Sequence, residues 1–241
     1  MSGDNSRSRR DLIRVVTVTG GGLLLAGCAA GGKGRGGGKE QKGGEGEQEV
    51  SPAEDLMREH GVLKRVLLVY GEALRRIESN QDLPPDPVAD AAGIVRSFVE
   101  DYHERLEEQY LFPRFRKANT LVELVDVLTR QHEGGRRLTD LTLRYAKLDS
   151  LRDADGRQKL ADSMRQFIRM YNPHEAREDT VLFPAFRRIV SRNEYDSLGE
   201  QFENKEHELF GEDGFEKMVD RVANIEKALG IYDLSQFNPR V

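Results

Sequence analysis

The sequence has one cysteine and no tryptophan among its 241 residues. A lone cysteine, Cys28, excludes a disulfide within the chain. No apolar run reaches the length of about 20 residues that a membrane-spanning helix needs. The formal net charge is −5 and no basic cluster stands out, so the footprint of a nucleic-acid-binding protein is missing. The alternation of apolar and polar residues typical of a strand is also absent, which predicts an all-α fold.

The first 27 residues resemble an export signal. Arg9 and Arg10 form a twin-arginine pattern ahead of a glycine-rich apolar stretch at 15–25. This stretch ends in Leu-Ala-Gly-Cys, which resembles a bacterial lipoprotein cleavage box with Cys28 as the lipidated residue. We therefore expect an exported, membrane-anchored lipoprotein on the periplasmic or cell-surface side. The alternative is that the arginine pair belongs to a signal for the general export route.

Residues 28–50 contain Gly, Lys, Glu and Gln with almost no apolar side chain. Such a segment has no core to bury, and its composition predicts a flexible, hydrated tether between the lipidated cysteine and a folded domain. The residues that remain after it are enough for one domain.

A fifteen-residue motif occurs twice in this domain. One copy covers 103–117 (HERLEEQYLFPRFRK) and the other covers 174–188 (HEAREDTVLFPAFRR). Each copy begins with a His that is followed four residues later by a Glu: His103 with Glu107, and His174 with Glu178. On an α-helix this spacing places both side chains on one face, a turn apart. An imidazole and a carboxylate so placed form a pair of metal ligands, and two pairs predict two metal ions.

A further histidine precedes each copy at nearly the same distance. His60 lies 43 residues before the first copy and His132 lies 42 residues before the second. Each half therefore reads as one helix with a His, a connection, and one helix with a His and a Glu. Two such hairpins predict a four-helix bundle whose facing helices aim their ligands at a shared core site.

We therefore predict an up-down-up-down four-helix bundle of two repeated hairpins over residues 51–190. A C-terminal helical extension with two more helices follows over residues 191–241. Apolar periodicity, caps and breakers place the six expected helices at 51–77, 88–110, 121–148, 157 to beyond 173, 192–210 and 214–229. Asp153 to Gly156 is predicted as a loop, Gly134-Gly135 as a soft spot, and Pro173 as a kink or a break.

The ligand repeat and the two LFP segments resemble the hemerythrin-like (HHE cation-binding) family over roughly residues 52–190. The resemblance implies a non-haem centre of two iron ions, with manganese and zinc as open alternatives. It also implies that two carboxylates bridge the metals while the histidines fill outer positions. By matching positions, Glu107 and Glu178 are the bridges, with His60 and His103 toward one iron and His132 and His174 toward the other.

The sequence departs from the oxygen-carrying members at Arg136, where they have a fifth ligand His. A guanidinium carries a permanent charge and does not coordinate a metal. Glu104 directly follows His103, and a Glu at that position is a ligand in the hemerythrin-like domain of a eukaryotic iron sensor. We therefore predict Glu104 as the seventh ligand, with Glu175 and Asp179 as alternatives.

The function predicted from this resemblance is a non-enzymatic di-iron protein that binds or senses O₂, NO, peroxide or iron. Its expected partners are a small diatomic or peroxide ligand at the metals and a membrane through the lipid on Cys28, without nucleic acid. One alternative is a di-iron enzyme that removes peroxide or NO or oxidises ferrous iron. The other is a structural or interaction module that the metals stabilise. The fifth histidine, His207, lies outside the repeat and is expected at the surface.

Overall fold

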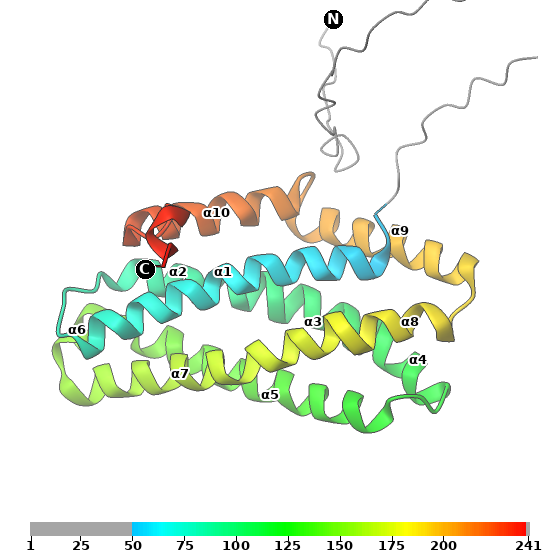
Figure 1. The fold of residues 1–241 in the computed structure, drawn as a ribbon, viewed down its shortest axis with the longest axis horizontal. Coiled ribbons are helices and arrows are strands. Elements are labelled where there is room, and N and C mark those ends of the chain that lie inside the picture. Colours follow the sequence, from blue (N-terminus) through cyan, green and yellow to red (C-terminus); the bar gives the residue numbers. More distant parts are fainter. Residues whose placement is uncertain (1–49, 240–241) are drawn as a thin grey trace, which may run out of the picture. The chain divides into compact units, whose positions relative to one another are not determined.

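The computed structural model describes residues 50–239, where all regular structure is helical (Figure 1). The predicted all-α class is confirmed for this part of the chain. The predicted signal residues Arg9 and Arg10, the lipidation site Cys28 and the tether up to residue 49 lie outside the described residues. Within residues 50–239, no helix is both long enough and apolar enough to cross a bilayer.

The first helix, α1, runs from Pro52 to Glu78 and starts where the sequence predicts. The Ser51 hydroxyl accepts from the Glu54 backbone N–H at 3.3 Å, and the Glu54 carboxylate accepts from the Ser51 N–H at 3.1 Å. This reciprocal capping box satisfies two backbone donors that the first turn leaves without partners. It fixes the residue at which α1 begins.

The second long helix is a continuous run of α and π segments rather than one uniform α-helix. Its parts are α2 (Pro85–Ile94), η2 (Val95–His103), α3 (Glu104–Leu106), η3 (Glu107–Leu111) and α4 (Phe112–Lys117). Pro113 has no backbone N–H and cannot continue the α-helical hydrogen bonds here. Just before it, the Phe112 N–H donates to the Glu107 carbonyl five residues earlier, which is the π pattern of the segment that begins at Glu107.

The second half of the chain repeats this design. Its helices are α5 (Val122–Tyr145), α6 (Leu148–Arg152), α7 (Ala154–Arg177), η4 (Glu178–Leu182) and α8 (Phe183–Ile189). Here Pro184 follows a π segment that begins at Glu178, as Pro113 follows the one that begins at Glu107. Both predicted bridging glutamates therefore stand at the first residue of a π segment, a type of distortion that is frequent at functional sites.

One local prediction in this half, the loop at 153–156, is wrong, and the break allowed for at Pro173 does not occur. Asp153 to Gly156 is not a loop, because the Asp153 carboxylate accepts from the Gly156 N–H at 2.8 Å and caps α7 from Ala154 onward. Pro173 does not split α7, since it lies on the exposed face, where water can bond the carbonyl that its ring leaves without a donor. Gly134 and Gly135 do not interrupt α5.

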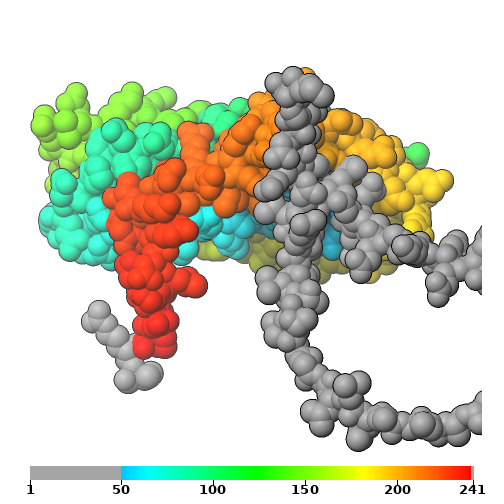
Figure 2. Space-filling model, turned by 90° about the horizontal axis from the view of Figure 1, so that it is seen from above, coloured from blue at the N-terminus to red at the C-terminus, as the bar shows by residue number. Residues whose placement is uncertain are grey.

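The four long helical runs lie side by side, with α7 packed against both α1 and α5, and α2 against α1 and α5 (Figure 1). The two predicted helices of the extension are confirmed as α9 (Arg192–Phe210) and α10 (Gly214–Leu229), followed by the short η5 (Leu234–Phe237). Figure 2 shows the segment of α9 and α10, coloured from gold to red, lying across part of one face of the folded part. The Arg65 Nε donates to Glu226 Oε1 at 3.0 Å and joins α1 to α10.

Candidate metal centre

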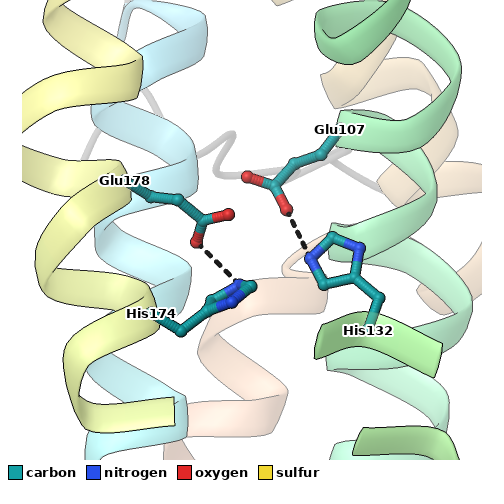
Figure 3. A group of neighbouring side chains, drawn as sticks. All are labelled: Glu107, His132, His174 and Glu178. Atoms are coloured by element: carbon teal, nitrogen blue, oxygen red, sulfur yellow. Dashed lines mark ion pairs between the residues drawn. The ribbon is translucent and has the colours of Figure 1, made fainter. Parts of the chain in front are cut away.

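The histidines and glutamates of the repeat meet in the interior between the four helical runs. Ligand atoms of one group lie within 4.8 Å of one another, and this group comprises Glu107, His132, His174 and Glu178 (Figure 3). A second group shares Glu178 and adds His60 and His103. All six residues are at most 3% exposed. The structure therefore brings together every residue of the predicted set of four His and two bridging Glu.

The Nε2 atoms of these imidazoles point toward the two central carboxylates. Nε2 of His132 lies 3.4 Å from Glu107 Oε2, and Nε2 of His174 lies 3.1 Å from Glu178 Oε2. Nε2 of His60 lies 3.4 Å from the same Glu178 oxygen, while Nε2 of His103 lies 3.8 Å from Glu107 Oε2. Each glutamate thus faces one histidine on its own helix and one on another helix.

Several of these buried atoms have no hydrogen-bond partner. They are Nε2 of His103, Nε2 of His132, and both carboxylate oxygens of Glu107 and Glu178. A buried polar atom without a partner costs about 1–3 kcal/mol, and a charged one costs more. A cluster of this many buried polar atoms without partners indicates that their native partner is a cation bound between them. The mixed nitrogen and oxygen donors fit iron, and the residues present therefore fit the implied metals.

An oxygen acceptor stands against the outer nitrogen, Nδ1, of every one of the four imidazoles. The pairs are His60 with Asp179 at 2.7 Å, His103 with Glu59 at 2.7 Å, His132 with Glu108 at 3.1 Å, and His174 with Gln131 at 2.9 Å. An acceptor at Nδ1 holds the proton there and leaves the Nε2 lone pair free to bind a metal. The four rings are thus oriented as metal ligands.

The sequence reasoning missed three of these supporting residues and assigned Asp179 a different role. The internal repeat contains the signal that could have found them. Glu59 and Gln131 each precede the histidine of their helix by one residue, while Glu108 and Asp179 each follow a central glutamate by one residue. Asp179 was predicted as an alternative ligand, but its carboxylate contacts the outer nitrogen of His60.

Without metal, the centre holds protons in place of cations. Burial raises the pKa of the Glu107 carboxyl well above its usual range, and the neighbouring charges of Glu178 and Glu104 raise it further. Burial opposes the charge on His60, but Asp179 and Glu178 outweigh it and raise the pKa of His60 to about 10. Burial and the neighbouring His60 lower the pKa of His103 to about 3. At neutral pH, His60 is therefore protonated and His103 is neutral, and burial favours the protonated form of Glu107.

Glu104, the predicted seventh ligand, lies at the edge of the centre and belongs to neither group above. Its Oε1 accepts from the Tyr171 hydroxyl at 2.6 Å, and its Oε2 lies 2.8 Å from Arg136 Nη2. It groups instead with Glu108 and His132. Arg136 faces this network and binds Glu104 and Glu108 rather than solvent. The role of Glu104 as a ligand stays a prediction.

The alternative Glu175 occupies the equivalent place in the other half. It is fully buried, and its Oε2 lies 2.8 Å from Lys64 Nζ. Lys64 follows His60 by four residues, as Arg136 follows His132, so each half pairs one buried glutamate with one cation. His207 is half-buried on α9 and belongs to none of the candidate metal groups among the described residues.

Gly135 makes room for the tyrosine that binds Glu104, which gives a testable prediction. A Cβ at Gly135 would lie 2.2 Å from the Tyr171 hydroxyl oxygen. Gly135→Ala should displace that hydroxyl and lower the free energy of unfolding by about 1–3 kcal/mol, as other overpacked cores do. Gly134→Ala is the matched control, because its Cβ would make only ordinary contacts, with Met170 Sδ at 3.6 Å and Arg137 Nη2 at 3.9 Å. In chemical denaturation the control should be neutral or slightly stabilising, and equal effects of both variants would contradict the prediction.

Comparison with known proteins identifies the class to which this centre belongs. Residues 51–150 match the family described as the hemerythrin HHE cation binding domain. An uncharacterised protein of Mycobacterium tuberculosis (strain ATCC 25618 / H37Rv) is 46% identical over 231 residues, which span 96% of this chain and 91% of the relative. An uncharacterised protein of Mycobacterium bovis matches equally well. No solved structure gives a significant match.

The chain therefore carries a hemerythrin HHE cation-binding domain over residues 51–150, as its motifs predict. The family match ends at residue 150, before the second copy of the motif. The internal repeat and the geometry of the buried cluster extend the site to His174 and Glu178. Together, the HHE domain and the His/Glu clusters fit a metal-binding function.

Proposed function

We propose that this protein binds two iron ions in a non-haem centre and uses them to bind or sense O₂, NO, peroxide or iron. The observation that carries the proposal is the set of buried imidazole nitrogens and carboxylate oxygens that face one another without hydrogen-bond partners. His60 and His103 would hold one iron and His132 and His174 the other, with Glu107 and Glu178 between them. Iron supplies redox chemistry and a Lewis-acid centre for small ligands.

The fold proposed for this centre is the up-down-up-down four-helix bundle of the family. Its helices would be α1, the run from α2 to α4, α5, and the run from α7 to α8. The packing of α7 against α1 and α5, and of α2 against the same two helices, supports this arrangement. It places one imidazole from each of the four helical runs at the centre.

The protein is further proposed to act outside the cytoplasm, tethered to a membrane by lipid on Cys28. The twin-arginine pattern at Arg9 and Arg10 and the cleavage box before Cys28 support this location. Labelling of cells with a radioactive or clickable fatty acid tests it directly. The expected result is a labelled, membrane-bound protein, and Cys28→Ala should lose the label. A wild-type protein that takes up no label would contradict the proposal.

Metal content and the optical spectrum test the proposed centre. Purified protein is loaded with ferrous iron without oxygen, freed of excess metal, and then exposed to O₂. Two irons per chain and a new charge-transfer band that disappears on degassing would support a ligand-binding role. Two irons that oxidise irreversibly would support iron sensing or chemistry on peroxide. Absence of bound iron would contradict the proposal.

A di-iron enzyme that removes peroxide or NO, or oxidises ferrous iron, is the second candidate. The observation that favours it is the number of carboxylates around the imidazoles, since Glu104, Glu108 and Asp179 join the two central glutamates. Anionic surroundings favour the higher oxidation state of iron. Repeated turnover with peroxide, NO or ferrous iron would establish the enzyme, and a single stoichiometric reaction would exclude it.

Metal binding should release protons, because metals replace the protons that the metal-free centre holds. His60 has a pKa of about 10 and so carries a proton at pH 7, and burial favours the protonated form of Glu107 as well. His60 must give up its proton to bind a metal, so we expect at least about one proton per chain on full loading. Calorimetry in buffers of different ionisation enthalpy measures this number. A value near zero would contradict the assigned protonation states.

A further inference from the structure

We infer that the two metal positions are unequal, and that the position held by His60 and His103 binds its cation more tightly and fills first. The inference rests on the proposed two-metal centre. It follows from the oxygen atoms that stand behind the four imidazoles, which break the symmetry of the repeat. The four ligand histidines themselves are equivalent between the two halves.

At the tighter position, a carboxylate supports each imidazole. Asp179 Oδ1 lies 2.7 Å from Nδ1 of His60, and Glu59 Oε2 lies 2.7 Å from Nδ1 of His103. Two more buried carboxylates, those of Asp55 and Glu206, lie within 4.8 Å of Glu59. A carboxylate therefore stands behind each of these two rings, and the one behind His103 belongs to a cluster of three.

At the weaker position, neither imidazole contacts a carboxylate oxygen that it does not share with another group. The acceptor at Nδ1 of His174 is the neutral amide oxygen of Gln131, at 2.9 Å. The acceptor at Nδ1 of His132 is Glu108 Oε1, at the longer distance of 3.1 Å. That same oxygen lies 2.7 Å from Nη2 of Arg136, so a permanent positive charge competes with the imidazole for it.

Lys64, which pairs with Glu175, does not compete with a ligand histidine for its oxygen acceptor, as Arg136 does. Its Nζ lies 2.8 Å from Glu175 Oε2 and 3.3 Å from Asn172 Oδ1, and neither of these oxygens supports a ligand histidine. The cation in the first half therefore binds a carboxylate away from Nδ1 of His60. The asymmetry between the two positions remains when both cations are considered.

A carboxylate behind an imidazole raises the basicity of the ring, and a neutral amide does so less. Such outer partners typically change metal affinity by about 10–100-fold. With both supports stronger at the position of His60 and His103, its affinity should exceed the other by at least about 10-fold. The residue that most directly sets this difference is Gln131, a positioning residue that touches no metal.

Stepwise titration of the metal-free protein with Co²⁺ alone, against a competing chelator, tests this inference. Wild type should bind two ions in two resolved steps that differ by at least about 10-fold. Gln131→Glu should tighten the second step and bring the two affinities together, while Glu59→Gln should weaken the first step. Gln166→Glu adds the same charge on the exposed face of α7 and should leave both steps unchanged.

Two histidine variants identify which step belongs to which position. His174→Ala should keep one tight step, and His103→Ala should keep one weak step. The reverse assignment, or equal affinities in wild type that Gln131→Glu does not change, would overturn the inference while leaving the two-metal centre intact. No Co²⁺ binding at all would instead overturn the proposed centre itself, together with this inference.

Discussion

Glu107→Gln should abolish tight metal binding while leaving the metal-free protein about as stable as wild type. The Glu107 carboxyl is fully buried, and burial and Glu178 raise its pKa well above the usual range, which favours its neutral form without metal. A neutral amide of the same size replaces it at little cost. A central ligand, however, is lost, and we expect metal affinity to fall by more than about 100-fold, beyond the effect of an outer partner.

Glu226→Gln is the matched control and should behave in the opposite way. Glu226 is also buried, but it bonds Arg65 and lies on α10, outside the candidate metal groups of the described residues. The variant leaves a partly buried guanidinium with a weaker partner and should lose about 1–3 kcal/mol of stability with both metals retained. Denaturation of the metal-free proteins and metal content after loading measure the two effects. Unchanged metal binding by Glu107→Gln would contradict its place in the centre.

The metal-free protein should lose stability as the pH rises from about 6.5 to about 10. Folded His60 has a pKa of about 10, above its value of 6.5 in the unfolded chain, so the folded state binds the extra proton in this window. The stabilisation is complete below pH 6.5 and is lost as the pH rises through the folded pKa. A difference of one in pKa between the folded and unfolded states changes the free energy of unfolding by about 1.4 kcal/mol. The loss of stability over this pH range should therefore reach several kcal/mol.

Bound metal should remove this slope, because the cation replaces the proton at His60. The gap in unfolding free energy between metal-loaded and metal-free protein should therefore widen as the pH rises. Urea denaturation in chelator and in excess metal measures the gap. His60→Gln should make the profile of the metal-free protein shallower, with the remaining slope due to Glu107, and His207→Gln should leave it unchanged. A flat wild-type profile would contradict the assigned protonation of His60.

The sequence was sufficient to predict the helical class and the residues that meet at the centre. The matched motifs carry the information, because a His and a Glu four residues apart share a helix face wherever the helix lies. The capping box at Ser51 and the bounds of α9 and α10 were also predictable, since caps and apolar periodicity are local signals.

Other features depend on contacts between distant parts of the chain and could not be predicted locally. Gly135 resembles a helix breaker in sequence, but it serves as the space into which Tyr171 of another helix fits. Arg136 was recognised only as a residue that cannot bind a metal, while its contacts with Glu104 and Glu108 appear only in three dimensions. The same holds for the oxygen acceptors behind the imidazoles, each of which comes from a different helical run than its histidine.

The most direct test of the proposed metal centre is the number of metal ions bound by the purified protein after anaerobic loading with ferrous iron and removal of the excess. We predict two irons per chain for wild type and a loss of tight binding in Glu107→Gln. A wild-type protein that retains no iron, or a Glu107→Gln variant that retains both ions with wild-type affinity, would contradict a metal centre built on these buried histidines and glutamates.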